Sequence, residues 1–134
     1  MEKVFKRDIQ ALDAIFDFLE ERISNNNLNE SLAFTLKFAV EEVFTNMVKY
    51  NPLGPDQISI SLVVKGENAI VELVDFEDVP FDITKTEPVN FDLPMEEKNP
   101  GGLGIHLVKT MVDKVDYQHI NNRSKVTLTI KLGR

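Results

Sequence analysis

The stretch Ala39 to Tyr50 reads AVEEVFTNMVKY and continues a helical pattern that begins near Asn29. Apolar residues recur along this pattern at every third or fourth position, which is typical of a helix with one buried face. They are Leu32, Leu36, Ala39, Val43 and Met47. The sequence NPLGP at 51–55 then supplies two prolines and a glycine, which end a helix. The stretch therefore predicts a long, mostly apolar helix from about residue 29 to residue 50.

Two polar residues of this stretch, Glu42 and Asn46, lie four positions apart and so project from one face of the predicted helix. That face lies beside the apolar one, at the margin of the buried side. A carboxylate and an amide this close together can orient a water or hydroxyl group and hold a hydrated divalent cation. A surface glutamate beside an asparagine near the helix end is the alternative, and the spacing alone leaves both open.

The rest of the chain alternates between helical and strand patterns. A first helix is predicted over residues 9–23, and a third helix follows the glycines at 101–104. Hairpin signals at 65–68 and 121–124 join consecutive strands. The predicted strands are 3–7, 58–64, 69–74, 116–120 and 125–132. Grouped helices and hairpin-linked strands predict an α+β fold, a two-layer α/β sandwich in which about three helices cover one face of a mixed, mainly antiparallel sheet.

Composition limits the class of protein. The 134 residues are 43% hydrophobic, which is enough for one core and predicts a single domain over 1–134. The absence of cysteine excludes disulfides and thiolate metal sites. The net charge of -7 argues against direct contact with nucleic acid. No apolar run approaches the roughly 20 residues that span a bilayer, so we expect a cytoplasmic protein that makes no membrane contact.

Residues 76–103 show no clear periodicity and hold most of the six prolines. A domain that keeps so long an irregular segment usually uses it as a lid or a binding loop. We therefore predict a flap over 76–103.

The run VDFEDVPFD, from Val74 to Asp82, places several carboxylates at the end of a predicted strand. An aspartate in this position can accept a hydrogen bond from the exocyclic amine of a base, while proline and phenylalanine cover the flat face of the base. An acidic turn in solvent is the commoner alternative.

The run PGGLGIHLVK at 100–109 places glycines before a helix. Glycines leave backbone N–H groups free to approach a phosphate, and the helix N-terminus adds a favourable partial charge. A flexible turn before the helix is the alternative. The run is not the dinucleotide fingerprint, because no βαβ unit surrounds it.

The order of these motifs resembles that of the GHKL ATPase superfamily, in which an N box, a G1 box and a G2 box follow one another. The matching segments are EEVFTNMVKY at 41–50, PFD at 80–82 and GGLGIHLVK at 101–109. Within this superfamily the sequence is similar to the anti-sigma-factor serine kinases of the RsbW type. The resemblance implies a Bergerat-type sandwich that binds ATP and Mg²⁺ between the helical layer and the flap.

The resemblance also implies roles by position. Glu42 is expected to be the general base for a serine hydroxyl, Asn46 to coordinate Mg²⁺, and Lys98 to contact a phosphate. Further nucleotide contacts are expected from Lys49, Asp75, Phe76, Asp78, Phe81, Gly101, Gly102, Leu103, Gly104 and Ile105. The expected partners are a small anti-anti-sigma protein of the STAS type, a sigma factor, and a second copy of the chain in a homodimer.

The G1 segment departs from the family pattern Asp-x-Gly-x-x-Phe. Counting back from Phe81, Phe76 stands where the family has the aspartate that takes the adenine amino group, and Asp78 stands where it has glycine. Asp75 lies one residue early, and a one-residue shift along a strand turns a side chain to the opposite face unless a bulge restores it.

Three functions therefore follow as hypotheses. The first is an ATP-binding regulatory serine kinase, supported by the N box and the glycine loop. The second is a degenerate family member that has lost nucleotide binding and acts as a protein-binding module, suggested by the altered G1 turn. The third is the ATPase domain of a histidine kinase, which the lack of a preceding phosphoacceptor helix disfavours.

Overall fold

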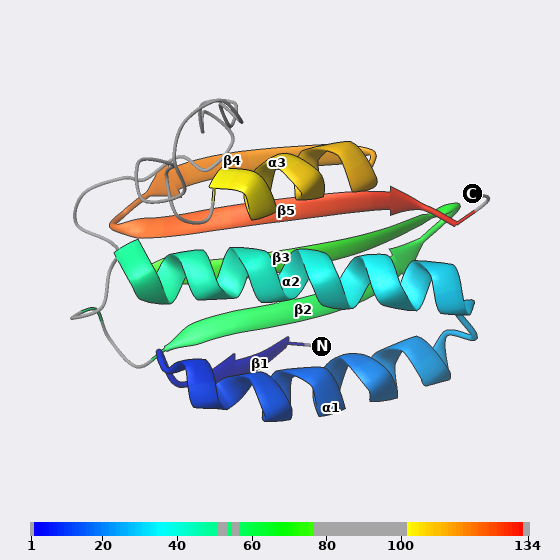
Figure 1. Cartoon of the computed structure of the whole chain (residues 1–134), viewed down its shortest axis with the longest axis horizontal. Helices are drawn as coiled ribbons and strands as arrows, with labels where there is room; N and C mark the ends of the chain where they lie inside the picture. Colours follow the sequence, from blue (N-terminus) through cyan, green and yellow to red (C-terminus); the bar gives the residue numbers. More distant parts are fainter. Residues whose placement is uncertain (1, 51–53, 55–56, 77–101, 133–134) are drawn as a thin grey trace.

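The computed structural model describes residues 2–50, 54, 57–76 and 102–132 (Figure 1). Along the chain the elements are β1 (Glu2–Phe5), the 3-10 turn η1 (Ile9–Ala11), α1 (Leu12–Asn25), α2 (Glu30–Tyr50), β2 (Ile58–Lys65), β3 (Asn68–Phe76), α3 (Gly102–Met111), β4 (Lys114–Ile120) and β5 (Arg123–Lys131). No helix in these ranges combines the length and the apolar character needed to cross a membrane.

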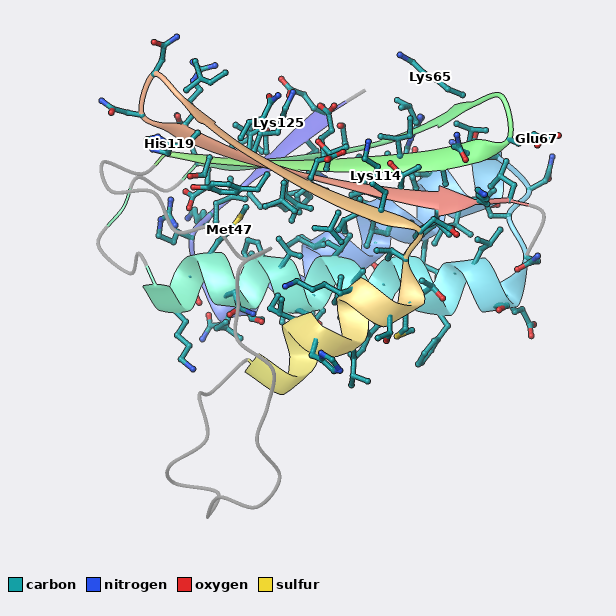
Figure 2. All side chains as sticks on the ribbon, turned by 90° about the horizontal axis from the view of Figure 1, so that it is seen from above. Met47, Lys65, Glu67, Lys114, His119 and Lys125 are labelled. Carbon is teal, nitrogen blue, oxygen red and sulfur yellow. The ribbon has the colours of Figure 1, made fainter. Side chains whose placement is uncertain are left out.

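The strands form one sheet in the order β1-β2-β3-β5-β4, and every pairing among the described strands is antiparallel. The helices α1, α2 and α3 all lie on one side of this sheet (Figures 1 and 2). The predicted α+β sandwich is therefore confirmed, with antiparallel pairing throughout the described sheet in place of the mixed pairing we expected. Strand β1 ends at Phe5, earlier than the predicted 3–7, so Arg7 lies beyond the strand.

Both predicted hairpins are present, and their turn residues explain the strand register. In the turn between β4 and β5, Asn121 and Asn122 have φ angles of 55° and 61°. Asparagine tolerates this left-handed conformation, and two such residues match the twist of the flanking strands. Between β2 and β3, Gly66 has a φ of 58°, where a side chain would be strained.

The core lies between the sheet and the helices, with α2 at its centre. Helix α2 contacts α1, α3 and β3. Its start is fixed by Asn29, whose side-chain oxygen accepts a hydrogen bond of 2.8 Å from the Leu32 N–H. Along the helix, Val40, Val43 and Phe44 are fully buried. Because one face of α2 is held by the core, the residues beside that face have fixed positions too.

Candidate functional site

A cavity of about 260 Å³ lies beside the second half of α2. It is lined by Ile9, Glu42, Thr45, Asn46 and Lys49. Residues 42, 45, 46 and 49 of α2 share one helix face because they are spaced by three or four positions. The structure thus brings Lys49 beside Glu42 and Asn46, and these two share a helix face, as their spacing predicted.

Asn46 is held in a fixed orientation at this cavity. Its side chain is only 4% exposed, and its Nδ2 group donates a hydrogen bond of 2.6 Å to the backbone carbonyl of Glu42. An amide bound through its nitrogen has its oxygen left as an acceptor. An oxygen of this kind is a ligand that Mg²⁺ accepts.

Glu42 meets the first turn of α3 at Gly104. A Cβ atom built on Gly104 would overlap Oε2 of Glu42, so a residue larger than glycine would displace the carboxylate or the helix. This contact joins the predicted N box to the predicted glycine loop. Partial burial, and secondarily the negative charge of Glu41, raise the pKa of Glu42 above its ordinary value.

The start of α3 supplies backbone donors next to Glu42. The helix begins at Gly102 and includes Leu103, Gly104 and Ile105 in its first turn. The N–H groups of a first turn have no partner within the helix and favour an anion. Ile105 is only 2% exposed and belongs to the core. Its N–H comes one position after the N–H groups of Gly102, Leu103 and Gly104, which have no partner within the helix.

Several predicted residues lie outside the described part of the chain. They are Asp78, Phe81, Lys98 and Gly101, together with the side chains of Phe76 and Leu103. The predicted flap over 76–103 also falls almost entirely outside it.

Asp75 is fully buried in an ion pair with Arg7. Arg7 Nη1 donates to Oδ2 of Asp75 at 3.2 Å, Nη2 contacts Oδ1, and neither side chain is exposed. Arg7 Nη1 also donates to the backbone carbonyl of Met47 at 3.2 Å. The side chain of Met47 lies between α2 and the sheet (Figure 2). The pair therefore links the segment after β1 to α2 and to the end of β3.

The position of Asp75 corrects the expectation drawn from the G1 offset. Strand β3 pairs with β5 residue by residue from Asn68 to Phe76, without a bulge. Asp75 nevertheless lies on the inner face, in line with the buried Val71 and Leu73. The buried residues of a strand fix which face each side chain takes, and here they turn Asp75 inward.

Arg7 is a residue of this region that the sequence patterns missed. It follows a short strand and belongs to no periodic pattern, and no motif connects it to a residue 68 positions away. Arg7 nevertheless acts directly on Asp75, because its buried guanidinium binds both oxygens of the Asp75 carboxylate. In this arrangement both carboxylate oxygens are already hydrogen-bonded inside the protein.

Comparison with known proteins identifies the family. Residues 5–130 match the family described as histidine kinase-like ATPase domain. The chain belongs to the histidine kinase-like ATPase family. The predicted resemblance to the GHKL superfamily is therefore confirmed. A search of curated proteins found no match.

Solved structures share the fold of this ATPase domain at low sequence identity. The RsbU and RsbW domains of a Mycobacterium tuberculosis protein match with a TM-score of 0.71 and 15% identity, over 98% of this chain and 31% of that one. A chain of the SiaB-SiaC complex from Pseudomonas aeruginosa matches with a TM-score of 0.61 and 11% identity, over 97% and 88%. The Acinetobacter baumannii histidine kinase AdeS matches with a TM-score of 0.57 and 13% identity, over 100% and 68%. At these identities the likeness shows a shared fold.

Replacing Arg7 with methionine is expected to lower the free energy of unfolding by about 3 to 5 kcal/mol, because Asp75 would stay buried without a partner. The double variant Arg7→Met/Asp75→Leu should recover most of this loss, since neither charge remains in the core. Urea denaturation of the wild type, both single variants and the double variant measures the coupling. Simple addition of the two single losses would contradict a buried pair.

Replacing Glu42 with glutamine is expected to stabilise the ATPase domain near neutral pH. The raised pKa of Glu42 means that the folded state binds this proton more tightly than the unfolded state. The stability that Glu42 contributes is therefore present below its unfolded pKa, about 4.3, and is lost as pH rises through its folded pKa. Thermal melts should show Glu42→Gln above wild type near pH 7.5 and equal to it near pH 4. A difference that does not change with pH, or an equal gain in the exposed Glu21→Gln control, contradicts this assignment.

Proposed function

We propose that the chain is an ATP-binding regulatory serine kinase of the anti-sigma-factor type. It phosphorylates a small STAS-type anti-anti-sigma protein or sequesters a sigma factor, and acts in the cytoplasm as a homodimer. The observation that carries the proposal is the contact of Glu42 with Gly104, which brings the polar face of α2 against the first turn of α3. Membership of an ATPase family supports ATP as the ligand. The RsbW domain and the SiaB-SiaC complex among the similar structures support a protein partner.

The phosphates are proposed to bind at the start of α3, where the backbone N–H groups of Gly102, Leu103 and Gly104 have no partner within the helix. Asn46 fits Mg²⁺ as a ligand, because its buried amide is anchored through nitrogen and keeps its oxygen for the metal. When bound, Mg²⁺ neutralises negative charge on the phosphates. Lys49 lines the same cavity and adds a positive charge.

Glu42 is proposed to take the proton from the serine hydroxyl. Its raised pKa makes it a stronger base than an ordinary surface carboxylate. Gly104 acts as a positioning residue, because the absence of a Cβ leaves room for the Glu42 carboxylate.

We also propose nucleotide contacts from further residues of the predicted motifs. They are Phe76, Asp78, Phe81, Lys98 and Gly101, with the segment 76–103 as a flap over the nucleotide in a single domain of 1–134.

The buried ion pair of Asp75 changes the proposal for how the adenine base of the nucleotide is recognised. Because Arg7 occupies both of its oxygens, we propose that the nucleotide is held through its phosphates, with little contribution from the base. The same observation favours a second candidate function, in which the domain has lost useful nucleotide affinity and regulates by protein binding alone.

Incubation of the protein with Mg·ATP labelled at the γ-phosphate and a candidate STAS protein is expected to label a serine of that protein. Glu42→Ala should lose this labelling and keep nucleotide binding, because the proposed base touches the hydroxyl and not the nucleotide. Binding is measured as stabilisation against unfolding, which reaches roughly 2.7 kcal/mol at about 100 times the dissociation constant.

Two controls separate the roles in this experiment. Asn46→Ala should lose the Mg²⁺-dependent part of the stabilisation, and the exposed Glu21→Ala should behave as wild type. Labelling by Glu42→Ala at the wild-type rate would remove Glu42 from the base role. No stabilisation of the wild type by millimolar Mg·ATP would reject the kinase and leave the protein-binding module.

A further inference from the structure

An aromatic pair lies exposed on the helical layer. Phe34 of α2 is 65% exposed, the largest exposure among the bulky apolar side chains of the described residues. Its ring stacks on Phe38, with ring centroids 6.3 Å apart and planes 12° from parallel. Exposing two aromatic rings to water is unfavourable. Exposed apolar side chains that lie together often mark a binding surface.

The two rings belong to a groove of about 330 Å³ between α1 and α2. It is lined by Phe16, Glu20, Phe34, Lys37, Phe38 and Glu41. The two helices run side by side in front of the sheet (Figure 1), and Lys37 forms an ion pair with Glu20 across the groove. A groove between two neighbouring helices is the shape that a third, amphipathic helix fills.

The surroundings of the groove are acidic. Asp13 and Asp17 on α1 are exposed within a turn of Phe16, and Glu30 on α2 is exposed one turn before Phe34. These carboxylates add to Glu20 and Glu41 of the groove itself.

The basic residues of α1 and α2 do not balance these carboxylates. Arg22 directs its guanidinium away, to the carbonyl of Leu62 on the sheet, at 2.9 and 3.2 Å. Lys37 is already paired with Glu20, and Lys49 lies in the site cavity. The groove is therefore an apolar surface with a negative rim.

We propose that this groove docks an amphipathic helix of a partner protein. The docked helix presents aliphatic or aromatic side chains to Phe16, Phe34 and Phe38, and lysine or arginine at its flanking positions. The apolar contacts supply affinity, and the opposite charges supply orientation and a faster encounter. A second copy of this chain does not fit, because a symmetric contact would place the two acidic rims against each other.

The groove is separate from the site cavity, so docking does not require bound nucleotide. The two surfaces are nevertheless adjacent on α2, because Glu41 lines the groove and Glu42 lines the cavity. A helix docked in the groove thus lies beside Glu41, which is the sequence neighbour of Glu42, the proposed general base.

The test uses a fluorescein-labelled, alanine-based helical peptide of about 16 residues, with two leucines one turn apart and flanking lysines. One control peptide has both leucines replaced by alanine, and another has the lysines replaced by glutamate. Fluorescence anisotropy with the full chain, without nucleotide, should show binding of the first peptide only. Added salt should weaken this binding.

Variants of the protein locate the binding. Phe34→Ala/Phe38→Ala should weaken binding at least about tenfold, which is the effect of losing a central apolar contact. Asp17→Lys/Glu30→Lys should weaken it too, through the charges alone. Ile120→Ala is the matched control, because Ile120 is an apolar side chain 60% exposed on β4, and it should bind as wild type.

Three results would overturn the proposal. The first is equal binding of the leucine peptide and the leucine-free peptide. The second is wild-type affinity in Phe34→Ala/Phe38→Ala, or in Phe34→Ala alone if the double variant melts early. The third is a dimer, seen by light scattering, that Phe34→Ala dissociates, which would assign the groove to a second copy. Because every measurement is made without nucleotide, a failure of the kinase proposal leaves this result unaffected.

Discussion

The buried ion pair between Arg7 and Asp75 is the contact on which the arrangement of the candidate site depends. Arg7 comes from the segment after β1, binds the end of β3 through Asp75, and binds α2 through the carbonyl of Met47. A buried charge that loses its partner is strongly unfavourable, so these three segments are held in one geometry. Asn46 is the neighbour of Met47 and shares its fixed position. The same pair binds both oxygens of Asp75, the acid that the sequence predicted as a nucleotide contact.

Helix α2 connects this ion pair to the candidate site and to the exposed groove between α1 and α2. One side of the helix is in the core through Val43. A second side of the helix places Glu42 against Gly104 of α3, and the outer side exposes Phe34 to solvent. A helix fixed on its buried side gives its other two sides fixed positions at no further conformational cost. The proposed catalytic residue and the proposed docking groove therefore lie next to each other on one rigid element.

Those features that depend on local periodicity could be predicted from the sequence, and those that depend on a distant contact could not. The spacing of Glu42 and Asn46 predicted their shared face, because four residues along a helix return to the same side. Arg7 and Asp75 are separated by 68 positions, and only the completed fold brings them together. The alternation of apolar residues along β3 could have predicted that Asp75 faces the core. The one-residue offset from the family motif predicted the opposite face instead. The flap was predicted from its composition and stays a prediction.

Equilibrium binding of Mg·ATP and Mg·GTP to the wild-type chain, measured by isothermal titration calorimetry, tests the central claim most directly. If the site holds the phosphates through α3 and Asn46 while Arg7 occupies Asp75, both nucleotides should bind, with dissociation constants within about threefold of each other. A preference for ATP of about 100-fold or more would contradict the account, because discrimination of that size needs a free acceptor for the adenine amine. Absence of binding for both nucleotides would contradict the phosphate site itself.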